Sequence, residues 1–381
     1  MSEHVDLSRP AASAPAPAPA AAPVPSVVRR LRDLHPGWLA AVMGTAILAV
    51  ATDANPGALP ALASAGHVVG AVLAVVAYAI GLVLLVAYAL RWVRHTDAAL
   101  ADLRHPVLGG LHATLPGAIL VLAVMTAALG ERLMPAGAVT ATIAVLAVVG
   151  TVLALVFGVA FGYALFTGDA PASAVNGGWF IPPVVTVIVP MALTPLMPHV
   201  GADLARLLLF VGYACLGLGF ILFLLVLGML HDRLVLHPLP PAQLAPSLWI
   251  ALGPIGVSAL VPMNLARAGQ AVFAADAQVV TTVSRVFATA VWGFGLWWLA
   301  IAVALLVRYL RTGPVPFHLG WWGFVFPLGA FTVATVTLAR AWQLPAVDVL
   351  GVLLYLGLAT AWAVAATRTI AAVRSGQVWR R

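Results

Sequence analysis

Residues 134–168 read MPAGAVTATIAVLAVVGTVLALVFGVAFGYALFTG, a run of thirty-five positions without a charged side chain. The hydrocarbon core of a bilayer is about 30 Å thick, and about 20 helical residues cross it. A transmembrane β-barrel would instead show short strands of alternating polarity. The stretch therefore predicts a membrane-spanning helix and is longer than one crossing requires.

The whole chain shares this composition. Of its 381 residues, 63% are hydrophobic and 8% are charged, and the mean hydropathy is +1.06. Soluble domains carry about 25% charged residues, so most of the folded surface must face something other than water. A single cysteine, Cys215, excludes a disulfide framework and a zinc site built from several cysteines. We predict an all-α integral membrane protein without a metal or a cofactor.

Ten apolar spans follow one another from Pro36 onward, which predicts a ten-helix transmembrane domain over residues 28–368. The Ala/Pro-rich segment 1–27 cannot bury a core and is expected to be a disordered cytoplasmic tail. Residues 369–381 are expected to form a short basic cytoplasmic tail. The spans cover about 36–53, 66–91, 107–130, 136–167, 180–198, 203–230, 244–263, 286–308, 320–340 and 346–368.

The arginines orient these spans. All nineteen basic residues are Arg, and the net charge is +7. With the N-terminus inside, fourteen lie on the cytoplasmic side, and the five on the other side are Arg132, Arg206, Arg267, Arg285 and Arg340. Because cytoplasmic loops carry the basic excess, both termini are predicted to be cytoplasmic, in a multi-pass protein of the plasma membrane. The arginines form no stripe, so no nucleic-acid partner is expected.

Prolines divide the spans into two kinds. Even-numbered spans have none in their interiors, whereas four of the five odd-numbered spans do, and the first carries Met43-Gly44-Thr45. Proline frees a backbone carbonyl, which a membrane tolerates where it faces protein or a wet cavity. The alternative is an accident, because transmembrane helices use Pro and Gly more than soluble ones do. The candidate pore-lining or kink residues are Gly44, Thr45, Pro116, Pro190, Pro254, Pro262 and Pro327.

The irregular spans also recur at regular distances. Their starts lie 64 to 76 residues apart, which predicts five tandem helical hairpins. The simplest arrangement places the irregular helices around a central pore and the regular helices outside them, against lipid.

Four motifs occur in order in the odd-numbered spans. They are Pro36-Gly37-Trp38 followed by Ala41-Val42-Met43-Gly44-Thr45, Trp179-Phe180-Ile181-Pro182-Pro183, Leu248-Trp249-Ile250-Ala251-Leu252-Gly253-Pro254 and Trp321-Trp322-Gly323-Phe324-Val325-Phe326-Pro327. Together they resemble the tellurite-resistance/dicarboxylate transporter family. That family includes bacterial tellurite-resistance proteins, fungal malate transporters and sulfite efflux pumps, and plant slow anion channels.

The resemblance implies ten helices in five hairpins around a pore, commonly assembled as a homotrimer with one pore per subunit. It also implies that a Phe of the ninth helix plugs the pore. Alignment on the Phe-Pro pair assigns this role to Phe326, and Phe324 is the competing assignment.

Ionisable residues are absent from the centres of the spans. All twelve acidic residues lie in the tail, in loops or at span ends. Proton-coupled carriers usually keep such groups deep in the membrane. His112 is the one candidate for a pH-sensitive role, and its alternative is a histidine that hydrogen-bonds locally at a helix end.

An anion pathway needs no buried arginine, because helix N-termini and a positive vestibule attract anions. The candidates for an anion-attracting mouth are Arg104 and Arg233 on the cytoplasmic side and Arg206 and Arg267 outside. The alternative is that these arginines only anchor helix ends.

The sequence contains none of the common catalytic motifs, so we predict that the protein is not an enzyme. The leading hypothesis is transport of small inorganic or organic anions through a Phe-gated central pore, as a channel or channel-like exporter. The alternative is a proton-coupled carrier for C4-dicarboxylates such as malate, for sulfite or for tellurite-related oxyanions. A non-transporting enzyme or scaffold is the third class, and the sequence leaves the identity of the anion open.

Overall fold

The computed structural model describes residues 27–379, and every regular element in this part of the chain is helical. The predicted all-α class is therefore confirmed. Ten helical spans are long and apolar enough to cross a membrane, as predicted. Of the predicted tail 1–27, all but Val27 lies outside the described residues.

Five spans form an inner group. Each begins with a short 3₁₀ segment that leads directly, or after two residues, into an α-helix. The segments and their α-helices are η1 Pro36–Leu39 and α2 Ala40–Asp53, η2 Gly109–Ala113 and α5 Thr114–Leu129, η5 Gly177–Phe180 and α7 Ile181–Leu193, η7 Ala242–Trp249 and α9 Leu252–Ala268, and η9 Leu319–Phe324 and α12 Val325–Trp342.

Five longer spans surround this group. They are α3 Pro60–Arg94, α6 Ala136–Thr167, α8 Ala202–Leu236, α11 Ala277–Thr312, which follows the short α10 Gln270–Phe273, and α13 Pro345–Arg374. Each packs against the inner helix that precedes it in the chain. Such contacts are what tandem hairpins require.

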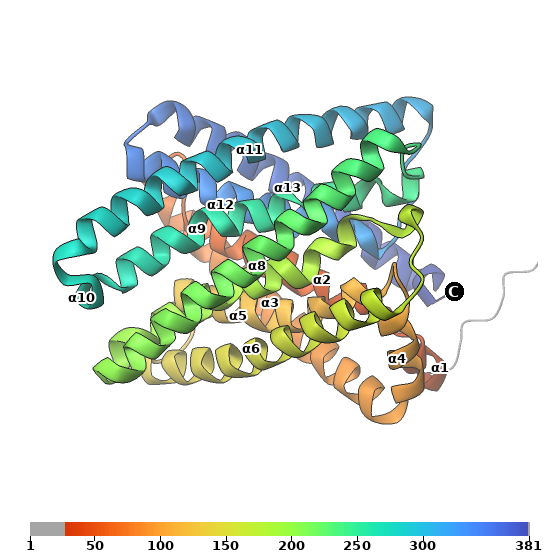
Figure 1. The fold of residues 1–381 in the computed structure, drawn as a ribbon, viewed down its shortest axis with the longest axis horizontal. Coiled ribbons are helices and arrows are strands. Elements are labelled where there is room, and N and C mark those ends of the chain that lie inside the picture. Colours follow the sequence, from red (N-terminus) through yellow and green to blue (C-terminus); the bar gives the residue numbers. More distant parts are fainter. Residues whose placement is uncertain (1–26, 380–381) are drawn as a thin grey trace, which may run out of the picture.

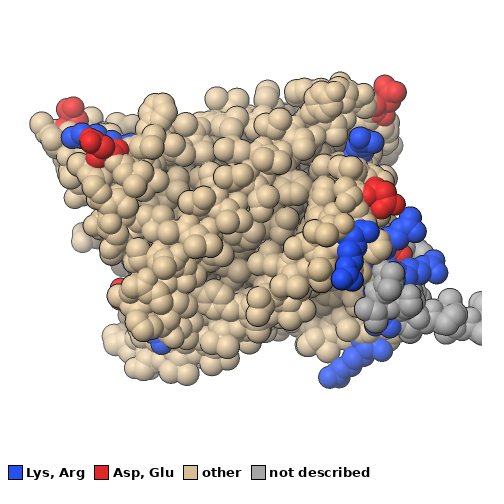
Figure 2. Space-filling model, turned by 90° about the horizontal axis from the view of Figure 1, so that it is seen from below, with Lys and Arg blue, Asp and Glu red and all other residues tan. Residues whose placement is uncertain are grey.

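Burial separates the two groups. In the most apolar window of each inner span, between 78% and 89% of the residues are buried, against 17% to 28% in the outer spans. The outer helices expose large apolar side chains such as Leu82, Phe166 and Phe210. Figure 2 shows a broad band without Arg, Asp or Glu between two charged ends of the molecule. An apolar surface of this extent is suited to lipid.

Both ends of the described chain lie at one end of the bundle, called here the terminus end (Figure 1). There α1 Val27–Arg32 precedes the first inner span, and α4 Thr96–Arg104 lies between α3 and η2. The last span runs to Arg374 rather than to Arg368, and Trp379 beyond it stacks on Trp38 with ring centroids 5.7 Å apart. Part of the predicted basic tail is therefore helical and packed.

The sequence predicted that the prolines kink the inner helices, but several of them lie in the first turn of an α-helix instead. Pro116, Pro254 and Pro327 are each the third residue of their α-helix. The first N–H groups of a helix have no intrahelical carbonyl to bond, so a proline here sacrifices no α-helical hydrogen bond. These prolines therefore mark the change from 3₁₀ to α geometry. Pro190 and Pro262 do lie inside α7 and α9.

Three inner spans begin with the same side-chain cap. The backbone N–H of Gly37 donates to His35 Nδ1 (3.0 Å), and that of Gly320 donates to His318 Nδ1 (3.0 Å). The N–H of Gly178 donates to Asn176 Oδ1 (2.8 Å). A β-carbon on any of these glycines would lie within 3 Å of the capping side chain, so the close approach requires glycine. A Trp follows each of them.

The cap on the ninth span also joins two spans. His318 Nε2 lies 2.6 Å from the carbonyl oxygen of Gln243, which precedes the seventh span's α-helix. Neutral imidazole with its proton on Nε2 satisfies both contacts. Partial burial of the ring lowers the pKa of His318 below its ordinary value and so favours this neutral form.

Candidate functional site

A small cavity lies where the five inner spans meet near their α-helix starts. Its volume is about 40 Å³, and its exposed lining is apolar. One water-sized sphere needs about 10–15 Å³, so the cavity has room for very few waters. Every inner span contributes: the lining residues are Ala40, Met43, Thr114, Ile181, Val184, Ile250, Gly253, Trp322, Gly323, Phe326 and Pro327.

Phe326 is the largest apolar side chain that α12 places in this cavity. The residue is 6% exposed. Its ring lies against Gly253 of α9, since a β-carbon at Gly253 would be 3.7 Å from Phe326 Cε1. The ring therefore lies beside a position without a side chain, next to the cavity that it lines.

Phe324 points elsewhere. Its ring centroid lies 5.3 Å from that of Trp249 and 6.0 Å from that of Trp321. It lines a surface groove together with Leu306 of α11 and Leu356 of α13. Of the two phenylalanines proposed from the sequence, Phe326 faces the inner helices and Phe324 faces the outer ones.

The inner helices close against one another beyond the cavity. One turn after the lining residues Met43, Val184, Gly253 and Phe326, the side chains on the same helix face are at most 7% exposed. These buried positions are Ile47, Ile188, Val257 and Ala330.

A second turn further on, the same face is partly exposed again, at Val50, Met191, Leu260 and Val333. Two turns span about 10.5 Å. The fully buried segment of this face is therefore about one turn long and apolar, and side chains toward the end away from the termini are partly exposed.

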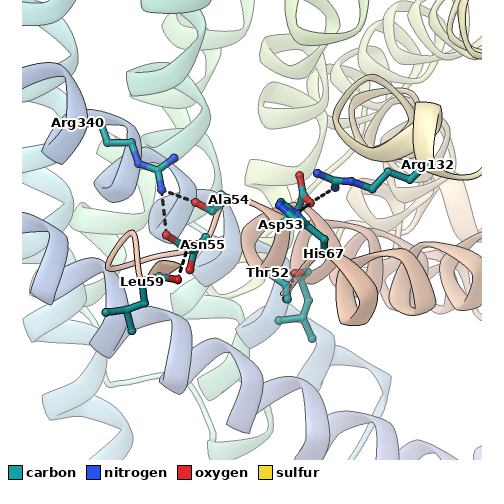
Figure 3. Close-up of polar contacts among 9 residues, drawn as sticks. Thr52, Asp53, Ala54, Asn55, Leu59, His67, Arg132 and Arg340 are labelled. Carbon is teal, nitrogen blue, oxygen red and sulfur yellow. Dashed lines mark hydrogen bonds and ion pairs between the residues drawn. The ribbon is translucent and has the colours of Figure 1, made fainter. Parts of the chain in front are cut away.

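Polar contacts tie the inner helices together at that far end (Figure 3). The Asp53 carboxylate, at the end of α2, accepts a hydrogen bond from Arg132 and lies 2.7 Å from His67 Nδ1. Arg340, near the end of α12, donates to the carbonyl oxygens of Ala54 and Asn55. A third contact joins the fifth and seventh spans, where the Thr194 hydroxyl donates to Asn264 Oδ1.

Most of the pore-lining candidates from the sequence lie away from the cavity. Pro327 is among its lining residues, whereas Gly44, Thr45, Pro116, Pro190, Pro254 and Pro262 are not. Thr45 donates to the Ala41 carbonyl and accepts from Trp362 Nε1 (3.0 Å), so it faces the outer helix α13. Gly44 lies against Trp322 and Val325, where it allows α2 to approach the ninth span closely.

The four candidate mouth arginines are also outside the cavity lining. Arg104 is exposed on α4, and Arg206 forms an exposed ion pair with Asp203 (2.9 Å). Arg233 is buried on the outer helix α8 and donates to the Pro238 carbonyl (3.0 Å). Arg267 is exposed beside Arg285 in a shallow surface cavity at the far end.

His112 is buried and turned away from the cavity, although Thr114, two residues later, lines it. Its Nδ1 lies 3.0 Å from the Tyr88 hydroxyl, and its ring packs on Trp92 and Phe157. His112 therefore bonds a side chain of the neighbouring outer helix α3, and its role in any pH response stays a prediction. Within residues 27–379, no three His, Cys, Asp or Glu side chains group closely enough to hold a metal ion.

Arg91 is a buried residue whose structural role the sequence did not reveal. Its side chain is fully buried, donates to Asp102 Oδ2 (2.6 Å) and also donates to the Arg32 carbonyl (2.9 Å). It thereby joins α3 to α1 and α4. Hydropathy alone placed Arg91 at a span end and could not show that α4 folds back over it.

The cavity residues Met43, Ile181, Val184 and Gly253 were not among the site candidates. Apolar residues occupy every face of the inner helices, so hydropathy carries no signal for the face that meets the axis. Which face of an inner helix turns toward the axis depends on where the neighbouring helices pack.

The sequence as a whole matches a known family. A sequence model of the voltage-dependent anion channel family matches residues 33–370, which is nearly all of the described chain. The chain belongs to this family. The resemblance found in the sequence is therefore confirmed.

Relatives of the chain include transporters from distant organisms. It is 30% identical to an uncharacterized transporter of Methanocaldococcus jannaschii, over 92% of this chain and 96% of the relative. It is 26% identical to a sulfite efflux pump of Arthroderma otae, over 89% and 91%. A malic acid transport protein of Schizosaccharomyces pombe matches at 26% identity over 42% of this chain and 37% of its own length. The voltage-dependent anion channel family thus spans channels and transporters of anions, and this chain is a multi-pass anion-transport protein in that general sense.

Proposed function

We propose that the chain conducts small anions down their electrochemical gradient between its five inner helices, with Phe326 as the gate. The observation that carries this proposal is the central cavity, which all five inner spans line and whose wall includes Phe326. Membership of the voltage-dependent anion channel family supports it.

Selection for anions follows from charge and helix direction. All five inner spans start at the terminus end, so the positive ends of their dipoles point to the same mouth. The net charge of +7 adds a positive field. The lining itself carries no fixed charge, so ions bind weakly and leave easily, and the pore selects mainly by sign, size and ease of dehydration.

Phe326 closes the route by occupying it with an apolar ring. Ions cannot shed their water against apolar walls, so a constriction of this kind blocks by steric exclusion and dewetting. A change of the Phe326 side chain to another staggered rotamer would move the ring off the axis. Gly253, opposite the ring, offers no side chain to obstruct that motion.

A proton-coupled carrier is the second candidate, because relatives are named as a sulfite efflux pump and a malic acid transport protein. Such a carrier needs a titratable group on the transport route. At the far end, the Asp53 carboxylate contacts His67 and already accepts a hydrogen bond from Arg132. The buried positions one turn beyond the cavity, Ile47, Ile188, Val257 and Ala330, are apolar. This arrangement favours the channel.

Purified protein in liposomes separates the two functions. We expect anion currents that reverse at the anion equilibrium potential and do not change when a pH gradient is imposed. The panel is chloride, nitrate, sulfite, malate and tellurite, each tested singly. Uphill anion accumulation driven by a pH gradient alone would establish the carrier instead.

We further propose that the protein lies in the plasma membrane with both termini cytoplasmic, and that it assembles as a homotrimer with one pore per subunit. The distribution of arginines supports the orientation, since the terminus end holds most of them. Protease removal of an N-terminal tag from sealed cells would contradict this orientation, and native mass spectrometry measures the number of subunits.

A further inference from the structure

A large lateral groove separates two outer helices, α6 and α8, in the half of the bundle near the termini. Its volume is about 680 Å³, and most of its lining is apolar. Its floor is the start of the fifth span, including Trp179, Pro182 and Pro183. The groove therefore leads from the lipid-facing surface to an inner helix.

Glycines hollow out this groove from both sides. Gly158 and Gly162 lie on α6, and Gly228 lies on α8. A β-carbon at any of these three positions would meet no described atom within 4 Å. Packing within the chain therefore does not require glycine there. By contrast, Gly219 of α8 is needed for contact with α7, since its β-carbon would lie 2.7 Å from the Pro183 carbonyl oxygen.

The end of the groove nearest the termini carries one positive and one negative side chain. Arg233 is 6% exposed, and its buried Nε has no hydrogen-bond partner among the described residues. Its neighbour Asp232 is exposed at the same rim. An unpaired donor on a buried guanidinium is costly and is normally satisfied.

We propose that this groove binds phosphatidylethanolamine from the leaflet on the terminus side. One acyl chain lies in the apolar groove, the phosphate meets Arg233, and the ammonium group meets Asp232. The apolar walls suit the acyl chain, and the paired charges at the rim complement a headgroup that carries both signs. An anionic lipid would leave Asp232 facing a negative headgroup.

The bound acyl chain has a direct neighbour in the candidate pore. Pro182 and Pro183 form the groove floor, while Ile181 and Val184 of the same helix line the central cavity. The lipid therefore supports one wall of that cavity from behind. The binding itself does not depend on the anion that the pore carries.

Native mass spectrometry of delipidated protein titrated with phosphatidylethanolamine tests the proposal. We expect one tightly bound lipid per chain. Gly162→Leu and Gly228→Leu should each weaken its binding about tenfold, because a leucine in the groove displaces contact equivalent to about two methylene groups. Gly217→Leu is the matched control on α8. Its β-carbon also meets no atom within 4 Å, and Gly217 is not a lining residue, so binding should be unchanged.

Three results would overturn the proposal. The first is equal affinity in wild type and in both groove variants. The second is tighter binding of phosphatidylglycerol than of phosphatidylethanolamine, which would contradict the role of Asp232. The third is a cross-link between two copies through Gly162→Cys in a Cys215→Ala background, which would place a second chain in the groove instead. Failure of the anion-flux experiments would leave these binding results unaffected, so the two proposals fail separately.

Discussion

Phe326→Ala is expected to raise anion efflux from proteoliposomes by about tenfold or more. The substitution removes the ring that fills the cavity beside Gly253 and leaves a wider passage between the inner helices. A tenfold change in rate corresponds to about 1.4 kcal/mol off the barrier, and removing an apolar plug is worth at least that much. The measurement is chloride or nitrate efflux under a fixed membrane potential, normalised to the amount of folded protein.

Phe324→Ala is the matched control, because it deletes the same ring two residues away in a groove between outer helices. Its efflux should equal that of wild type. Equal efflux from the Phe326→Ala variant and wild type would contradict the gate, and increased efflux from Phe324→Ala alone would transfer the role to that residue.

Gly256→Ala is expected to destabilise the protein by about 3 kcal/mol, at the upper end of the usual cost of overpacking. A β-carbon at Gly256 of α9 would lie 2.6 Å from the carbonyl carbon of Ala330 and from the amide nitrogen of Phe331. Both are backbone atoms of α12, so relief requires the two inner helices to move apart. The measurement is the thermal unfolding midpoint in detergent, followed by intrinsic fluorescence.

Gly293→Ala is the control for Gly256→Ala, because it makes the same substitution in another membrane-spanning helix. Gly293 is exposed on α11, and its β-carbon would meet no described atom within 4 Å. Alanine favours helix over glycine by about 1 kcal/mol, so this variant should be as stable as wild type or slightly more stable. An unfolding midpoint of the Gly256→Ala variant equal to that of wild type would contradict the close contact between α9 and α12.

The sequence predicted the ten spans and their two classes because both depend on properties that act along the chain. Apolar length marks a span, and proline is tolerated where other helices cover the backbone. The burial of the inner and outer spans in the structure follows this division. Span ends were less accurate: the second span was predicted to begin at residue 66 and begins at Pro60, since uncharged residues continue on both sides.

The site was harder to predict, because it depends on how each helix is turned about its own axis. Thr45 and Thr114 are both hydroxyl residues near the start of an inner helix, yet Thr114 lines the cavity and Thr45 bonds to Trp362. The helices are apolar on every side, so no periodicity distinguishes these two positions. The Phe326 assignment came from the family resemblance, and the residue's place in the cavity now supports it independently.

The sequence carries a recognisable pattern at the His35 and His318 caps. Each is followed two residues later by glycine and then by Trp, as is Asn176. A polar side chain two positions before a glycine at the start of a span is a candidate 3₁₀ cap, because glycine alone allows the close approach.

Anions are proposed to pass between the inner helices, and a cysteine in place of Leu260 tests this route most directly. Leu260 lies two turns beyond Gly253 on the same face of α9 and is partly exposed. The experiment uses the Phe326→Ala variant with buried Cys215 replaced by Ala, and a negatively charged methanethiosulfonate reagent added from the far side. Modification of Leu260→Cys should block anion efflux, whereas modification of Val279→Cys, on the exposed side of outer helix α11, should not. Unchanged efflux after complete modification of Leu260→Cys, verified by mass, would contradict a route between the inner helices.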